Sequence, residues 1–181
     1  MIKPLFILSF LLIATVFLSG CFGMKPEKSG ASGKLYESFF VGDEGTQYFI
    51  KAIKFSSNLN SDQTWADITF RYKNELKDSA TINFSFLNKK LLKSIDSISI
   101  QNNDKYTSST NFKLLFAEKV KNYYKSRFTV KFKLSDIGSL FNNYNWVIKA
   151  YSKNESFNYY ATKKTKKQLS KINDEIIILF K

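Results

Sequence analysis

Hydrophobic and polar residues alternate one for one along three stretches of the chain. Residues 64–73 are the clearest case, with apolar side chains at every second position and polar or charged side chains between them. Residues 80–86 and 127–134 follow the same pattern. A strand needs this alternation when one side of its sheet packs on a core and the other side meets water. The pattern therefore predicts three half-buried antiparallel strands.

Weaker strand signals lie around these three. Aromatic and β-branched residues, which favour strands, are concentrated in five further segments, although their alternation is imperfect. These segments are residues 35–40, 48–55, 94–100, 146–151 and 156–161. Turn-forming Gly, Asn, Asp and Ser residues separate them, and a spacing of about ten residues between strands is typical of an antiparallel sandwich or barrel.

Four segments depart from the alternation. Apolar residues recur at helical spacing over residues 112–123, which predicts a helix there. Residues 163–174 place their apolar side chains on one side of a lysine-rich segment, which predicts a short amphipathic helix. Residues 135–142 predict a single helical turn. The unbroken apolar run at residues 175–180 predicts a buried final strand.

The first two dozen residues follow a different pattern. Lys3 precedes an uncharged run over residues 4–20 that is dominated by Leu, Ile, Phe and Val and ends on two small residues, as in a secretory signal peptide. The sequence Leu18-Ser19-Gly20-Cys21 then resembles the lipobox of bacterial lipoprotein precursors. The resemblance implies cleavage before Cys21 and acyl chains on that cysteine. It places the protein in the cell envelope, at the outer membrane or cell surface, with the membrane as a partner.

An uncleaved anchor is the alternative. Residues 4–24 carry no charge and are long enough to cross a bilayer as a helix. Both interpretations hold the rest of the chain outside the cytoplasm. With the lipobox, residues 1–20 are the signal peptide and residues 21–34 are the lipidated cysteine and a Gly-rich flexible tether. Residues 35–181 then form one domain.

Two further resemblances concern the fold and the source. Residues 64–86, which follow a turn at Gly42-Asp43 and a strand, are similar to immunoglobulin-like domains of some Gram-positive lipoproteins. The predicted fold class is mainly β: an antiparallel immunoglobulin-like β-sandwich with one or two short helices. The composition, rich in Lys, Asn, Ile and Phe and poor in Arg, is similar to that of spirochaetal or mycoplasmal lipoproteins.

The sequence lacks the residues that most catalytic mechanisms use. Histidine is absent and the lipobox uses the one cysteine, so the usual general base, thiol nucleophile and soft metal ligands are missing. No nucleotide-binding, serine hydrolase or zinc protease motif occurs. Carboxylates such as Asp43 and Glu44 fall in turns, where acidic residues cap and solvate. We expect a protein that is not an enzyme and that uses no metal or cofactor.

The net charge of +13 is unevenly distributed. Residues 21–110 carry 12 basic and 10 acidic side chains, whereas residues 111–181 carry 15 and 5. Clustered lysines suit a polyanionic glycan or anionic lipid, and nucleic acid is not expected outside the cytoplasm. The alternative is a solvated surface in a lysine-biased proteome. The candidate anion-binding residues are Lys119, Lys121, Lys125, Arg127, Lys163, Lys164, Lys166, Lys167 and Lys171.

Aromatic residues are dense in the same half of the chain. They form either a binding platform for a sugar or protein partner, or core and cross-strand pairs. The candidate platform residues are Tyr144, Trp146, Tyr151, Tyr159 and Tyr160. The sequence thus favours an anchored lipoprotein that binds a ligand or partner at the cell envelope. A periplasm-facing structural or assembly lipoprotein that contacts envelope proteins is the second interpretation.

Overall fold

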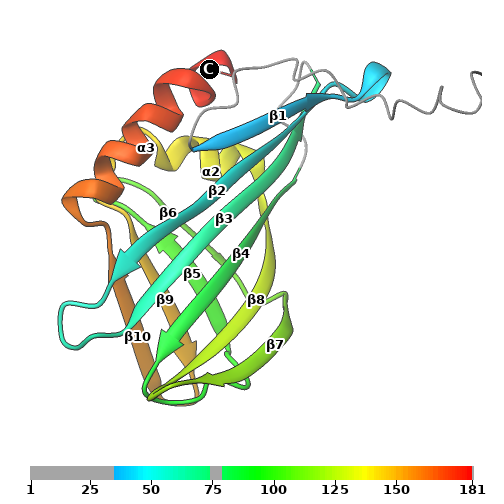
Figure 1. The fold of residues 1–181 in the computed structure, drawn as a ribbon. Helices are drawn as coiled ribbons and strands as arrows, with labels where there is room; N and C mark the ends of the chain where they lie inside the picture. Colours follow the sequence, from blue (N-terminus) through cyan, green and yellow to red (C-terminus); the bar gives the residue numbers. More distant parts are fainter. Residues whose placement is uncertain (1–34, 74–78, 181) are drawn as a thin grey trace, which may run out of the picture.

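The computed structural model describes residues 35–73 and 79–180. The predicted signal peptide, Cys21 and the tether lie outside the described residues. Ten strands form a single antiparallel sheet, and two short helices lie across one end of it (Figure 1). The strands are β1 (Tyr36–Phe40), β2 (Thr46–Ser56), β3 (Gln63–Tyr72), β4 (Ser79–Asn88), β5 (Ser97–Gln101), β6 (Tyr106–Ser109), β7 (Phe112–Val120), β8 (Tyr123–Lys133), β9 (Val147–Ser152) and β10 (Glu155–Tyr160). The helices are α2 (Leu134–Leu140) and α3 (Lys163–Glu175), with single 3₁₀ turns at Gly42–Glu44 and Ile177–Phe180.

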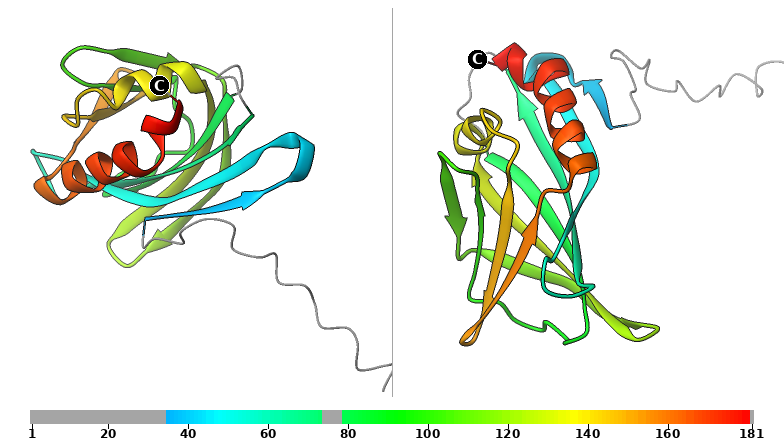
Figure 2. Two further views of the ribbon diagram at one scale, coloured as in Figure 1. Left: turned by 90° about the horizontal axis from the view of Figure 1, so that it is seen from above. Right: turned by 90° about the vertical axis from the view of Figure 1, so that its left-hand side faces the viewer.

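The sheet follows the order β6-β5-β9-β10-β2-β3-β4-β8-β7, and β1 pairs with the first half of β2. It twists and curls until β2, β3, β4 and β8 face β5, β9 and β10 across the core (Figures 1 and 2). The mainly β, antiparallel fold class is therefore confirmed. The two facing layers of the predicted sandwich are halves of one continuous sheet, joined between β10 and β2 by the single pair Tyr160–Ser56.

The core lies between these layers and follows the predicted alternation. Every second residue of β3, β4 and β8 is buried on the inner face. Phe84 and Phe132 meet there edge to face, with ring centroids 6.5 Å apart, and Phe86 contacts Phe128 in the same way at 6.0 Å. Aromatic pairs of this geometry contribute about 0.5–1.5 kcal/mol beyond the area they bury.

A β-bulge explains the imperfect alternation of residues 48–55. The register of β2 against β3 shifts between Ile50 and Ile53, so that Lys51 and Ala52 both face solvent. The buried set therefore moves from even to odd positions within one strand. The same strand pairs with β1 before the bulge and lies against α3 after it.

The predicted helix over residues 112–123 is wrong. These residues form β7 and the start of β8, joined by a tight turn in which Lys121 has a φ of 56°. A second bulge shifts the register between Leu114 and Phe116. The extra residue moves the apolar side chains from alternate positions to spacings of three and four, which imitate a helix. Pairing with the regularly alternating β8 overrides this local pattern.

The two other predicted helical segments are confirmed, and the final strand is not. Helix α3 matches residues 163–174, and α2 matches the predicted turn at residues 135–142. The predicted buried strand at residues 175–180 is wrong, because the chain keeps turning after α3 and forms a 3₁₀ turn over Ile177–Phe180. Ile176 and Ile177 pack into the core there. An apolar run without a period does not distinguish a strand from such a turn.

No helix of the described residues is long and apolar enough to cross a membrane.

Replacing Phe132 with Ala should destabilise the domain by about 3–5 kcal/mol, because the side chain is 4% exposed and a cavity would remain beside Phe84. Chemical denaturation of residues 35–181 would measure this. Phe40→Ala, at a 67% exposed phenylalanine, is the matched control and should change the unfolding free energy by less than about 0.5 kcal/mol. Equal effects at both positions would contradict the described core.

Candidate functional site

The basic tract at residues 163–171 lies on α3. Thr162 caps the helix by accepting a hydrogen bond from the backbone N–H of Thr165. Thr165, Leu169 and Ile172 face the core, and the Thr165 hydroxyl donates to the carbonyl of Lys54 on β2 at 2.6 Å. This orientation turns the lysines outward. The exposed lysines of α3 are Lys163, Lys164, Lys166, Lys167 and Lys171.

The electrostatics of α3 are unfavourable without a counter-ion. A helix N-terminus carries a partial positive charge, and each cation there costs roughly 0.3–1 kcal/mol at low salt. The first turn of α3 holds no acidic residue. Within the part of the chain that the structure describes, Lys171 is the one α3 lysine in an ion pair, with Glu175 at 3.4 Å. Four neighbouring ammonium groups at the positive end of a helix therefore form a surface that favours an anion.

The second basic tract lies elsewhere. Lys119, Lys121 and Lys125 belong to the β7–β8 hairpin, whose tip is at the opposite end of the molecule from α3 (Figures 1 and 2). The Lys125 ammonium lies 5.5 Å from the Phe116 ring centroid, as in a cation–π contact. The predicted anion-binding residues therefore do not form one site.

Arg127 is bound by residues of the sheet itself, so its contacts stabilise the fold rather than form a ligand site. Its guanidinium donates to the Asp67 carboxylate at 2.7 Å and to the Ser85 hydroxyl, on the neighbouring strands β3 and β4. The Arg127 and Asp67 side chains are 25% and 22% exposed. An ion pair across three strands fixes their outer face and leaves little of the guanidinium for a ligand.

Two of the five candidate platform aromatics belong to the core. Trp146 is 1% exposed, packs edge to face on Phe141 and donates its Nε1–H to the carbonyl of Leu140 at 2.9 Å. Tyr159 is also 1% exposed, and its hydroxyl donates to Asn88 at 2.8 Å. Burial raises the pKa of Tyr159 well above its ordinary value. For these two residues the core interpretation is correct.

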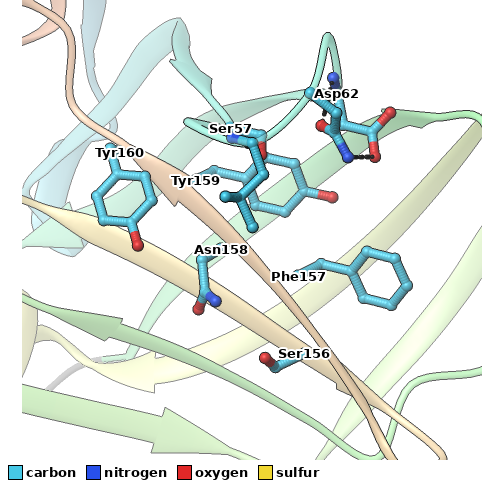
Figure 3. A pocket seen from close by; sticks show the side chains of 9 residues that line it. Ser57, Asp62, Ser156, Phe157, Asn158, Tyr159 and Tyr160 are labelled. Carbon is cyan, nitrogen blue, oxygen red and sulfur yellow. Dashed lines mark hydrogen bonds between the residues drawn. The ribbon is translucent and has the colours of Figure 1, made fainter.

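The other three platform residues are nearer the surface but do not gather. Tyr144 is half-buried, and its hydroxyl accepts a hydrogen bond from the Asn173 amide of α3. Tyr151 and Tyr160 lie on the outer face of β9 and β10, on the side away from Tyr159. Figure 3 shows Tyr160 and Tyr159, adjacent in sequence, pointing to opposite sides of β10.

The outer face of β9 also carries a lysine that sequence reasoning missed. Lys149 lies between Val147 and Tyr151 on one side of the strand. Tyr106 of β6, 64% exposed, belongs to the same face through the strand pairing. The alternation of residues 146–151 indicated that Lys149 faces outward. The pairing of β5 with β9 joins residues about 50 positions apart, so the local sequence gave no sign of it.

The hollows of the described surface are either open or small. Three open hollows of about 450–490 Å³ lie between residues 90–94 and the β9–β10 turn, beside Phe40 and Tyr72, and over Arg71 and Lys131. A hollow of about 70 Å³ lies between the loop at residues 57–62 and β10 (Figure 3). Pockets that enclose drug-sized ligands measure roughly 300–1,000 Å³, so this one suits water. Asp62 lines it, with both carboxylate oxygens already accepting hydrogen bonds, from Asn60 and from the N–H of Lys89. Residues 35–73 and 79–180 contain no group of three or more acidic, Cys or His side chains that could hold a metal ion.

Comparison with protein-family models, with curated proteins and with solved structures gave no match. The geometry of the described residues is therefore the basis for a functional proposal. It offers three surfaces: the lysine face of α3, the β7–β8 hairpin, and the outer face of β9 and β10.

The raised pKa of Tyr159 predicts a loss of stability in alkaline solution. The unfolded side chain ionises near its ordinary pKa of 10.0, whereas the folded one holds its proton to higher pH. The folded state then binds more protons, so the unfolding free energy falls as the pH rises above about 10. Urea denaturation at about pH 9 and about pH 11 would measure the fall. Tyr159→Phe should reduce the fall, and Tyr151→Phe, at an exposed tyrosine, should leave it unchanged. An equal fall in unfolding free energy in the unmodified protein, Tyr159→Phe and Tyr151→Phe would contradict the raised pKa of Tyr159.

Proposed function

We propose that this protein is a membrane-anchored bacterial lipoprotein without catalytic activity, acting at the cell envelope, whose α3 lysine face binds anionic lipid headgroups of the membrane that carries it. The observation that carries the proposal is the position of α3 beside the first residue of the domain. The carbonyl of Leu35 accepts a hydrogen bond from the N–H of Lys51, and Thr165 of α3 bonds Lys54. Lys51 and Lys54 are three residues apart on β2, a distance of about 10 Å.

This proximity matters because charge attraction to a membrane is short-ranged. Under the lipobox interpretation, the chain joins the domain next to α3 after a tether that spans about 20 Å when flexible. Each lysine near an anionic surface contributes about 1 kcal/mol, and the attraction falls off within roughly 8–10 Å at physiological salt. A short tether and four clustered lysines therefore act together. The acyl chains on Cys21 hold the domain, and α3 sets its orientation.

The β7–β8 hairpin favours a second function, that of a structural or assembly lipoprotein that contacts envelope proteins. In the described sheet β7 is the last strand, paired with β8 alone. Its side chains from Lys113 to Val120 are exposed, and Leu115 and Phe116 are 46% and 39% exposed. An exposed edge strand with apolar residues can accept a strand from another protein. The hairpin tip lies at the end away from α3, so a membrane-bound domain would present it outward.

The anchor is testable in cells of a bacterial host. Cys21→Ser should abolish incorporation of a labelled fatty acid and leave a precursor that retains residues 1–20, since the thiol is the acylation site that the lipobox implies. Gel mobility would report whether residues 1–20 are retained, and the fatty-acid label would report acylation of the same protein. Ser19→Ala, which keeps a small residue in the lipobox, is the matched control and should be processed normally. Label retained in the Cys21→Ser protein would refute the lipoprotein proposal.

The lysine face is testable with vesicles. Residues 35–181 should bind vesicles that contain phosphatidylglycerol, bind neutral phosphatidylcholine vesicles hardly at all, and lose binding as salt rises. Replacing Lys163, Lys164, Lys166 and Lys167 with Gln should weaken binding by a factor of about 100 or more, since each lysine contributes about 1 kcal/mol. The four side chains are exposed, so the melting temperature should not fall.

The matched control changes the same number of lysines at exposed positions away from α3. Lys89, Lys90, Lys93 and Lys153 are exposed and belong to loops and turns between strands. Their replacement by Gln removes the same net charge. Equal losses from both sets would show that net charge alone attracts the vesicles. If the α3 set had no effect, membrane binding by α3 would be refuted and the hairpin would become the favoured surface.

A further inference from the structure

The outer face of β6, β5, β9 and β10 brings together side chains from four strands. Residues that pair directly across antiparallel strands share a face. Tyr106 pairs with Gln101, Gln101 with Val147, and Val147 with Tyr160. These four residues therefore form one row across the face, with a tyrosine at each end. With strands about 4.8 Å apart, the two tyrosines begin roughly 14 Å from each other.

The next row is polar and centred on a lysine. Ser99 pairs with Lys149, and Lys149 pairs with Asn158. Tyr151 follows two residues after Lys149 on the same face of β9 and is 38% exposed. Lys149 is half-buried and has no ion-pair partner among residues 35–73 and 79–180. Lys149 therefore shares its face with three tyrosines and has no ion-pair partner there among the described residues.

Two orphaned polar atoms flank this lysine. Ser99 is 1% exposed, and its hydroxyl has no hydrogen-bond partner in the described structure. The side-chain carbonyl oxygen of Asn158 is also buried without a partner. Leaving a buried polar atom unpaired is costly, and such groups in native proteins call for a specific explanation. Figure 3 shows the Asn158 side chain on the same side of β10 as Tyr160, away from the core.

We propose that this face, the tyrosine face, binds an acidic saccharide, that is, a sugar carrying sulfate, phosphate or carboxylate. It is defined by Ser99, Tyr106, Lys149, Tyr151, Asn158 and Tyr160. The acidic group pairs with Lys149, and the exposed tyrosine rings pack against the C–H face of the sugar. Sugar hydroxyls both donate and accept hydrogen bonds, so they offer Asn158 the donor that its side-chain oxygen lacks, once that side chain turns outward.

The backbone at the centre of this face argues against a peptide that binds by strand addition. Strand β5 is paired with β6 and β9, and β9 is paired with β5 and β10. No strand edge is available at its centre, so strand addition cannot occur there. The hollow beside Asn158 holds about 70 Å³ and would not enclose a large side chain. A flat ring ligand fits such a shallow, aromatic and polar surface better than an extended chain does. This site is independent of α3 and of the membrane proposal.

The test uses the full chain solubilised in detergent and titrated with a heparin-derived hexasaccharide. A desulfated hexasaccharide and sodium sulfate are the comparison probes, and calorimetry gives the dissociation constant. We expect binding of the sulfated hexasaccharide, with Lys149→Gln weakening it about tenfold through loss of a charge-assisted contact. Tyr106→Ser should weaken it several-fold, and its 64% exposure means that the fold should persist.

Matched controls separate this face from general charge and general aromatic exposure. Lys89→Gln, at an exposed loop position, removes the same charge, and Phe40→Ser removes a ring that is 67% exposed elsewhere. Neither should change saccharide affinity, and Lys149→Gln should not change vesicle binding. An equal loss from Lys89→Gln would overturn the proposal, as would no effect from Tyr106→Ser. Failure to bind the hexasaccharide, or affinity for sodium sulfate equal to that for the hexasaccharide, would also overturn it.

Discussion

The continuous apolar side of one sheet is the constraint on which the rest of the structure depends. Strands β2, β3, β4, β5, β8 and β9 each have an inner row of apolar side chains, and no second sheet exists among the described residues to cover them. The sheet must therefore curl until its own halves face each other, and its open end must be closed by helices. Helices α2 and α3 close that end in Figure 1. The position of α3, and with it the lysine face, follows from this need to exclude water.

Where side chains repeat without interruption, the sequence was sufficient to predict the fold. The alternation in β3, β4 and β8 located three central strands, and the lysine-rich helix was recognisable from its apolar stripe. The wrong secondary-structure predictions fall where the alternation of apolar and polar residues is interrupted or absent. The bulge at Leu115 turned a strand pattern into an apparent helix, and the run after Glu175 had no period at all. A bulge depends on the partner strand, so one strand's own sequence does not reveal it.

The candidate sites were less predictable than the fold, for a related reason. The sequence indicated that the α3 lysines are exposed, because an amphipathic helix buries its apolar stripe. It did not indicate that the hairpin lysines lie at the other end, or that Arg127 is held by Asp67. Tyr159 and Tyr160 differ by one residue, and that single step sends one ring into the core and the other to the surface. Sites assembled from several strands depend on pairings that local sequence does not encode.

The single residue pair between β10 and β2 has a consequence for how this domain comes apart. Elsewhere neighbouring strands share four or more paired positions, but here Tyr160–Ser56 is the one backbone pairing that joins the two halves of the described sheet. The bond from Thr165 to Lys54 adds a second link across the same boundary. The two halves of the sheet are therefore joined less by backbone pairing than by the core they share, which includes the Phe86–Tyr159 ring contact and the buried hydrogen bond from Tyr159 to Asn88. A substitution that loosens this core would weaken the sheet first at this boundary, where the fewest backbone hydrogen bonds hold it.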